Sequence, residues 1–568
     1  MWKYLYLFLL TSIYINAQTP VWNSAKFSGG IPYQSNTQTV TDSQGNVYTF
    51  GVFDGSISFD NLSPITASYF SNGTKFFAKF DSLGNCLWLK KIEGTNTFTI
   101  NSAIIDNNNN IIIGCRSSSN LTNTVSQDDT TPIIQIDGNN FFIAKFDTNG
   151  NFLWSKKQDL GINYSSGIGD MTLGENNTFY VSGTYHSSGM TIDGINLPVN
   201  SFGNSNIFIG HFNSDGTIIW IKGFGDDIMD YNTTNIHFYG GNLFLSSFSN
   251  SDLSFDSVNI IAPVNTYFLQ FILKMSANGI PISGHEANLP LTDLTYIKKE
   301  FSGNYMYAYG SFDDSQLNIN GTILSKIGNR DIFIIKYNLD GTVVWAKSFG
   351  YSNHPISIED VFVDTADNIY LATNTSTPNF VFGTSTINNF GQYSTLIGKL
   401  NSDGNPIWAK NIANNLSNQH NFPQTITKAN NLIHVFGMFN YEQLNFDNIS
   451  VVFNPSPVTS FAESKIYYGS INESTLNTED FNSNALIYPN PTKDYLNLNS
   501  DYNNKTYKII DISGRIIQQG SIIDSFKINV SDLNKGLYLL YIANEISFKF
   551  LKDWMHDEKR YTTFKVRS

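Results

Sequence analysis

The sequence predicts an all-β fold, and three observations predict it. Aromatic residues make up 14% of the 568 residues, with 44 Phe and 30 Tyr. Aromatic and β-branched residues favour strands, and the 42 Gly suit the turns between them. A segment that ends in Trp also recurs at nearly constant spacing, which is typical of a repeated structural unit. Beyond the first 17 residues, no long stretch combines helical apolar spacing with a cap.

Residues 1–17 are typical of a secretory signal peptide. Lys3 supplies the positive charge, residues 4–15 form an apolar core, and Ala17 followed by Gln18 offers cleavage after a small residue. The apolar run is shorter than the roughly 20 residues of a membrane-spanning helix. No Cys follows that could carry a lipid anchor, and no later run is long and apolar enough to span a membrane. We therefore expect an exported chain that begins at Gln18.

Charge and cysteine content exclude several classes of protein. The net charge is −13, and no basic patch is present, which disfavours binding to nucleic acid or to an anionic lipid surface. The two cysteines, Cys86 and Cys115, could pair in an oxidising compartment, but their positions do not require it. Two isolated cysteines also make a poor metal site.

The Trp-ending segment is a hairpin. Residues 76–88 read FFAKFDSLGNCLW, and residues 141–154 read FFIAKFDTNGNFLW. Asp or Asn followed three residues later by Gly suits a tight turn between antiparallel strands, whereas a calcium loop would need more oxygen ligands than one or two acids. Successive copies lie 62 to 66 residues apart. The copies end at Trp22, Trp88, Trp154, Trp220, Ser283, Trp345 and Trp408.

A second hairpin lies between successive Trp hairpins, so that each unit holds four strands. Its seven copies cover residues 37–51, 102–114, 171–183, 236–247, 301–310, 361–373 and 425–437. The two middle strands of each unit are nearly continuous apolar runs, which indicates burial on both faces. Four-stranded sheets that bury both faces against like sheets form a β-propeller. We therefore predict a seven-bladed propeller over residues 18–472.

The ends of the repeat region predict how the ring closes. The seventh unit has a third strand at residues 465–470 but no Trp strand after it. Residues 20–27, before the first hairpin, match the missing strand. We expect these two segments to pair and so remove an exposed sheet edge.

This repeat resembles the bacterial β-propeller repeats called SBBP and, more loosely, the NHL repeats. The resemblance covers roughly residues 19–472 and is carried by the Trp hairpin and by the pattern of Asp42, Gly45, Asn46, Tyr48 and Gly51. It implies that the first strand of each unit lines a central channel and that the Trp series lies on the rim. The Trp residues could form a carbohydrate platform, but recurrence in nearly every unit favours packing between blades.

Residues 486–551 change character and predict about six short strands in a small β-sandwich. Their ordered motifs resemble the type A sorting domain of cargo of the Bacteroidetes type IX secretion system. The resemblance implies recognition by the outer-membrane translocon and removal by a C-terminal-signal peptidase in the linker at residues 473–485. Residues 552–568 continue past the usual end and are atypical. The motif residues are Pro489, Asn490, Pro491, Gly514, Gly536, Tyr538 and Lys549.

No catalytic, cofactor-binding or metal-binding residue is predicted. The eight His form no metal-binding pair, and no nucleophile elbow or phosphate loop is present. His211 takes the repeat position of Lys79, and the acidic pairs at residues 226–227 and 313–314 fit solvated loops. The favoured function is a monomeric binding or adhesion module for a glycan or protein ligand. The alternatives are a polysaccharide hydrolase or lyase, with acids from several blades at the channel mouth, and a purely structural surface protein.

Overall fold

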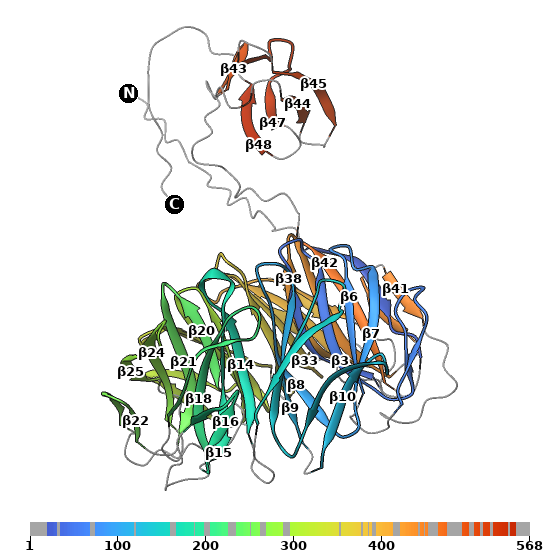
Figure 1. Ribbon diagram of the computed structural model, residues 1–568. Helices are drawn as coiled ribbons and strands as arrows, with labels where there is room; N and C mark the ends of the chain where they lie inside the picture. Colours follow the sequence, from blue (N-terminus) through green and yellow to red (C-terminus); the bar gives the residue numbers. More distant parts are fainter. Residues whose placement is uncertain are drawn as a thin grey trace. The chain divides into compact units, whose positions relative to one another are not determined.

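The computed structural model describes residues 20–473 and 491–552, with short gaps in both ranges. The chain forms two compact units, Met1–Glu473 and Ser474–Ser568. The signal segment with Ala17 and Gln18, the linker after Glu473, and the tail after Lys552 lie outside the described residues. Both units consist of β-sheets (Figure 1).

Seven antiparallel sheets with a four-stranded core make up the described part of the first unit, and we number them along the chain. Sheet 1 contains β2 (Gln34–Thr41), β3 (Val47–Phe53), β6 (Thr74–Phe80) and β7 (Cys86–Gly94), extended by β10 (Asn123–Gln127) and β11 (Thr131–Ile136). Sheet 2 contains β8 (Phe98–Ile105), β9 (Ile111–Ser117), β12 (Phe141–Phe146) and β13 (Phe152–Lys157). Sheet 3 contains β14 (Gly167–Leu173), β15 (Phe179–His186), β18 (Ser205–Phe212) and β19 (Ile218–Phe224), with a single 3-10 turn at Glu175–Asn177.

The remaining sheets follow the same order. Sheet 4 contains β20 (Asn235–Tyr239), β21 (Asn242–Ser249), β24 (Leu269–Ser276) and β25 (Pro281–Glu286). Sheet 5 contains β26 (Tyr296–Ser302), β27 (Tyr305–Phe312), β30 (Asp331–Asn338) and β31 (Val343–Phe349). Sheet 6 contains β32 (Ile356–Val363), β33 (Ile369–Thr375), β36 (Ser394–Leu400) and β37 (Pro406–Ile412). Sheet 7 contains β38 (Asn421–Ala429), β39 (Leu432–Phe439), β42 (Lys465–Asn472) and β1 (Val21–Phe27).

Small two-stranded hairpins occupy most of the loops between the second and third strands of these sheets. They are β4 (Ser56–Ile57) with β5 (Ile65–Thr66), β16 (Met190–Ile192) with β17 (Ile195–Leu197), β22 (Leu253–Phe255) with β23 (Val258–Ile260), β28 (Gln316–Ile319) with β29 (Thr322–Ser325), β34 (Asn379–Phe382) with β35 (Ser385–Asn388), and β40 (Gln443–Phe446) with β41 (Ile449–Val452).

The pairing of the chain's first described strand with its last repeat strand is as predicted. β1 runs antiparallel to β42, with Val21 opposite Asn472 and Phe27 opposite Tyr467. The Trp22 ring meets the Phe446 ring edge-on at 4.9 Å between centroids. Sheet 7 therefore combines both ends of the unit.

Neighbouring sheets pack through their end strands, which we call the inner strands. β2 contacts β8, β8 contacts β14, and the series continues through β20, β26, β32 and β38. β38 in turn contacts β2, so the orange strands of sheet 7 stand beside the blue strands of sheet 1 in Figure 1. The middle strands are buried on both faces, as their apolar runs predicted; every residue of β6 and of β12 is buried.

The recurring Trp packs between sheets, which confirms the packing interpretation. The Trp88 indole lies over Gly150 of the next sheet, where an added Cβ would come within 2.7 Å of the ring. Gly150 also has a φ of +70°, so both its backbone and its neighbour require glycine. Equivalent contacts are Trp154 on Gly216, Trp220 on Gly279 and Trp345 on Gly404.

The two cysteines are free and buried, so no disulfide joins them. Cys86 lies in β7 and Cys115 in β9, in neighbouring sheets. Burial raises the pKa of the Cys86 thiol to about 12, which keeps this thiol unreactive at neutral pH.

The second unit contains six described strands in two sheets, as the sequence predicted. β43 (Tyr495–Asn497) pairs with β46 (Lys527–Asn529). The other sheet has the order β45 (Ile516–Ser521), β44 (Thr506–Asp511), β47 (Gly536–Ile542) and β48 (Ile546–Lys552). Both sheets contribute to one buried core that includes Leu496, Ile509, Ile528 and Leu540.

Candidate functional site: the central cavity

All seven inner strands line one cavity of about 750 Å³. It is bounded by residues 37–41 of β2 and by the matching segments of β8, β14, β20, β26, β32 and β38. Five of these strands carry a β-bulge, which turns the next side chain toward a neighbouring sheet. One position of each inner strand, the same in every sheet, thus places its side chain against the neighbouring sheet.

The repeated position forms what we call the bridging ring, one residue from each sheet bonded to the next sheet. The Gln38 amide donates to the carbonyl oxygen of Asn101 at 3.0 Å, and the Ser102 hydroxyl donates to Asp170 at 3.1 Å. The series ends where the hydroxyl oxygens of Thr425 and Thr39 lie 2.8 Å apart, between sheet 7 and sheet 1. The members of the bridging ring are Gln38, Ser102, Asp170, Asn235, Lys298, Asp360 and Thr425.

Two acids of the bridging ring already have hydrogen-bond donors. Asp170 accepts the backbone N–H of Met171 at 2.8 Å and that of Ile236 at 3.2 Å. Asp360 accepts the N–H of Ile426 at 2.9 Å. Burial outweighs these bonds and raises the pKa of Asp170 to about 6. These carboxyl groups hold neighbouring sheets together, which limits their freedom to act on a ligand.

Glu300 is the third acid of the cavity, and its carboxyl makes no hydrogen bond with any other residue that the structure describes. Burial, followed by the negative charges of Asp170 and Asp360, raises its pKa well above the ordinary value. The adjacent Lys299 is 5% exposed, and burial lowers its pKa to about 7. Tyr309 lies 3.5 Å from Asp360. The cavity thus combines several carboxyl groups with a Tyr, and Glu300 is the uncommitted one.

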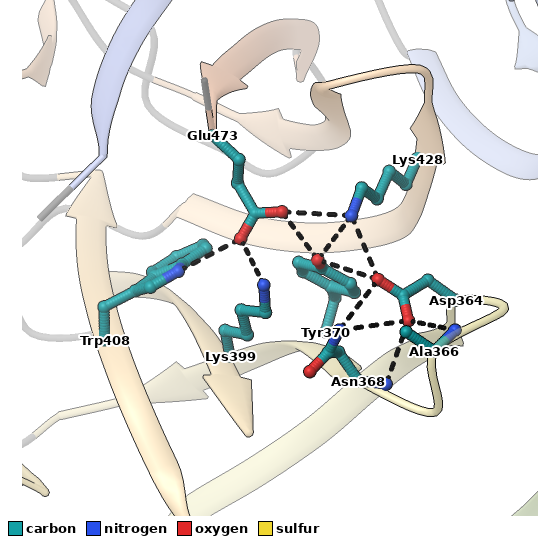
Figure 2. Close-up of polar contacts among 8 residues, drawn as sticks. All are labelled: Asp364, Ala366, Asn368, Tyr370, Lys399, Trp408, Lys428 and Glu473. Carbon is teal, nitrogen blue, oxygen red and sulfur yellow. Dashed lines mark hydrogen bonds and ion pairs between the residues drawn. The ribbon is translucent and has the colours of Figure 1, made fainter. Parts of the chain in front are cut away.

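A second polar network joins sheets 6 and 7 around Glu473, the last described residue of the first unit (Figure 2). Its carboxylate accepts the Tyr370 hydroxyl at 2.6 Å, the Lys399 ammonium at 2.9 Å and the Trp408 indole N–H at 3.2 Å. Lys428 lies 3.0 Å from Glu473 and 3.0 Å from Asp364. Sequence reasoning missed this network, because Glu473 belongs to the segment expected to be linker.

Glu473 replaces a backbone group that other sheets supply. The indole N–H of Trp154 donates to the carbonyl of Ser214 at 3.2 Å, and that of Trp345 donates to Ser402 at 3.0 Å. These carbonyls belong to the turn before the Trp strand of the next sheet. Sheet 7 has no such turn, because its Trp strand comes from the start of the chain. The Glu473 carboxylate takes that place beside Trp408.

The other residues that the sequence singled out lie apart from the cavity. His211 stacks on Tyr180 with 4.0 Å between ring centroids, opposite Trp220, in the register of Lys79 opposite Trp88. Asp313 is ion-paired with Arg330 at 2.8 Å, and residues 226–227 lie outside the described residues. Among described residues, no three His, Cys, Asp or Glu side chains are grouped as a metal site requires, and no helix is long and apolar enough to cross a membrane.

The predicted sorting-motif residues are only partly described. Pro489, Asn490 and Gly514 lie outside the described residues. Pro491 is exposed, Gly536 opens β47, and Lys549 lies in β48. Tyr538 is buried, and its hydroxyl donates to the carbonyl of Asn534 at 2.8 Å.

Residues 486–553 match the family described as the secretion system C-terminal sorting domain. The chain is exported by type IX secretion. A domain of this family marks proteins that reach the cell surface or the extracellular space, and this is the location of the protein. The match covers the second unit and does not assign a function to the first.

Comparisons of the whole chain give weaker results. An uncharacterised WD repeat-containing protein of Acanthamoeba polyphaga mimivirus is 25% identical over 521 residues, covering 74% of this chain. This chain spans only 36% of that relative. A protein of unknown function from Dyadobacter fermentans is 8% identical, with a TM-score of 0.32, covering 79% of this chain and 99% of its own. The polysaccharide lyase Uly1 is 10% identical, with a TM-score of 0.30, covering 66% of this chain and 89% of its own. These TM-scores are too low to support a shared arrangement.

Proposed function

We propose that the first unit is a seven-bladed β-propeller and that the mature protein is a binding or adhesion module of the cell surface or the extracellular medium. The bridging ring supports the architecture, since each of its seven members bonds the next sheet and Thr425 returns to Thr39. Completion of sheet 7 by β1 supports a closed ring, because closure leaves no sheet edge between the two ends. Glycans and proteins are the two ligand classes that we propose, and we expect a monomer.

The binding proposal rests on the hydrogen bonding of the three cavity acids. Acid–base hydrolysis of a glycosidic bond uses two carboxyl groups on opposite sides of the bond. Asp170 and Asp360 are engaged by backbone N–H groups, which leaves Glu300 as one uncommitted carboxyl. One free acid in a polar cavity can hydrogen-bond a hydroxyl of a ligand, and this favours binding over catalysis.

We also propose the route of export. Residues 1–17 direct export from the cytoplasm and are removed between Ala17 and Gln18. The translocon recognises residues 486–551, and the C-terminal-signal peptidase removes them with the atypical tail. Because Glu473 holds sheets 6 and 7, we expect the cut on its C-terminal side, within the remaining linker residues.

Truncation after Glu473 tests the export route. In a bacterium with a type IX system, the full chain should reach the surface or the medium, whereas the truncated chain should accumulate in the periplasm. Immunoblots of medium, surface and periplasmic fractions measure this. Because Glu473 ends the first compact unit, the truncated chain should keep the unfolding transition of that unit, and this serves as the control. Equal export of both chains would contradict the proposal.

A glycan-cleaving enzyme is the second candidate, and the raised pKa of Glu300 beside two other acids favours it. A carboxylic acid with a raised pKa is suited to donate a proton as a general acid. If the protein cleaves a polysaccharide, Glu300→Gln should lower the rate by about 10²- to 10⁴-fold. Release of reducing ends or unsaturated products from a polysaccharide panel measures this. Binding without cleavage by the wild-type chain would eliminate the enzyme candidate.

A further inference from the structure

Sheet 4 departs from the repeat at the register position of the Trp. Ser283 of β25 lies opposite Lys274, as Trp154 lies opposite Lys145 and Trp345 lies opposite Lys336. The junction between sheets 4 and 5 therefore lacks the indole that fills the equivalent space elsewhere. Loss of a large buried side chain ordinarily leaves a destabilising cavity.

The vacated space is a pocket of about 610 Å³ between the two sheets, which we call the Ser283 pocket. This volume falls within the roughly 300–1,000 Å³ of typical ligand sites. Its walls include the rings of Tyr239, Phe244 and Tyr305 and the polar side chains of Lys274, Ser283 and His285. Tyr239 is 39% exposed, so the pocket has an aromatic group at its entrance.

Other departures from the repeat converge on the same pocket. Two residues after the Trp, sheets 1 and 5 carry Lys90 and Lys347, whose ammonium groups bond the turn of the next sheet at 2.9 and 2.6 Å. Sheet 4 carries His285 there. The turns before β21 and β27 are also short, and a Cβ added at Gly240 or Gly303 would meet nothing within 4 Å. The backbone of β25 covers Gly341, where an added Cβ would come within 2.7 Å of the Glu286 carbonyl oxygen, so this strand fills part of the space that the indole occupies elsewhere.

Two polar groups of the pocket have no partner among the residues that the structure describes. Lys145 in the equivalent position pairs with Asp106 at 2.7 Å, whereas Lys274 makes no hydrogen bond or ion pair, and its recorded contact is the Phe244 ring at 5.9 Å. Leu339 takes the same place in its turn as Ser402, whose carbonyl accepts the indole N–H of Trp345. No described residue donates a hydrogen bond to the Leu339 carbonyl. The pocket thus offers a cation and an acceptor to a ligand. Its lining also includes the Asp340 carboxylate, which accepts the Thr342 N–H at 3.0 Å and the Thr342 hydroxyl at 2.6 Å.

We propose that the Ser283 pocket binds a sugar ring that carries a carboxylate or sulfate group. The exposed ring of Tyr239 suits the C–H face of the sugar, whereas Tyr305 already holds the Lys336 ammonium 3.7 Å from its ring centroid. Asn242, Asn304 and the Leu339 carbonyl suit the sugar hydroxyls. The unpaired Lys274 ammonium suits the anionic group. An aromatic side chain of a partner protein is the other possible occupant of the pocket. It is neutral and would bring no anionic group to the Lys274 ammonium. This inference rests on the proposed role as a binding module and names a ligand class for it.

Calorimetry with the full chain tests the pocket with matched probes. Trigalacturonate and a sulfated chondroitin disaccharide are the acidic probes, and fully methyl-esterified trigalacturonate is the neutral control. Wild type should bind at least one acidic probe and should bind the ester more weakly by roughly 10- to 100-fold, the effect of losing one charge-assisted hydrogen bond. Lys274→Met keeps the apolar stem and should remove that preference.

Ser283→Trp restores the repeat and should abolish acidic-probe binding with an unchanged or higher unfolding temperature. Trp220→Ser opens the equivalent space between sheets 3 and 4 and should leave binding unchanged, which controls for lost stability. The inference is overturned if no acidic probe binds, if a Trp-containing peptide or the neutral ester binds best, or if Ser283→Trp and Lys274→Met both bind like wild type. Binding that is lost only in Glu300→Gln would place the site in the central cavity, so the proposed function would stand while this inference failed.

Discussion

A mature chain that begins at Ser28 is expected to unfold at a much lower urea concentration than the complete chain and to aggregate. The missing residues remove β1, and with it the outer strand of sheet 7. Trp22 is 6% exposed and contacts Phe446, and loss of this side chain alone should cost about 3–5 kcal/mol. The deletion also uncovers the backbone of β42, and an unpaired strand edge promotes association with other chains.

Urea denaturation followed by tryptophan fluorescence and circular dichroism measures the loss, and light scattering reports aggregation. Val21→Ser is the matched control, because Val21 lies on the same strand with 55% of its surface exposed and should change stability by less than about 0.5 kcal/mol. Equal transition midpoints for the shortened and complete chains would show that β1 is dispensable for the stability of the first unit.

The sequence predicted the strands, the four-stranded units and the pairing of the two ends, because these depend on local patterns and on the number of repeated segments. The spacing of the Trp hairpins predicted units of four strands, because turn residues and apolar runs recur with the unit. The pairing of β1 with β42 was predictable because the seventh unit lacked a Trp strand after residue 470. Residues 20–27 were a spare segment with the pattern of that missing strand. In the second unit, short apolar segments between turns predicted about six strands, and the described residues form six.

The small hairpins in the variable loops were not predicted, although their signal was visible. Phe followed by Asp recurs at Asp60, Asp256 and Asp447, and each of these Asp residues has a φ of about 50°. Asp tolerates this left-handed conformation better than most residues, so the recurring pair marks a tight turn. Strands of two to four residues are too short for a periodic pattern, which is why the turn residue was the only usable signal.

The sites themselves depend on contacts between sheets, which sequence spacing does not contain. Asp170, Glu300 and Asp360 are far apart in the chain, and only the packing of the inner strands brings them to one cavity. Ser283 was recognised as a gap in the Trp series, but the pocket also needs Tyr305 from the next sheet. Glu473 has no motif at all, and its role follows from the missing turn of sheet 7.

Glu473→Ala is expected to destabilise the first unit by about 3–5 kcal/mol, the cost of removing one partner from a buried ionic network. The side chains of Lys399 and Glu473 are only 15% and 12% exposed, so water replaces the lost contacts poorly. Lys399 and Trp408 would lose this acceptor, and Lys428 would keep Asp364 and the Tyr370 hydroxyl. Glu473→Gln retains an acceptor oxygen without the charge and should cost less than the alanine substitution.

The pH dependence gives a further measure of the same contact. Burial raises the pKa of Glu473, but the Tyr370 and Lys399 hydrogen bonds and the charges of Lys399 and Lys428 outweigh it and hold the pKa below its ordinary value. The ionised form therefore stabilises the folded state above the ordinary pKa, and this stabilisation is lost as the pH falls through the lower folded value. Urea midpoints measured between neutral and acidic pH should fall more steeply for wild type than for Glu473→Gln. Parallel pH profiles would show that the Glu473 charge contributes nothing to the closure between sheets 6 and 7.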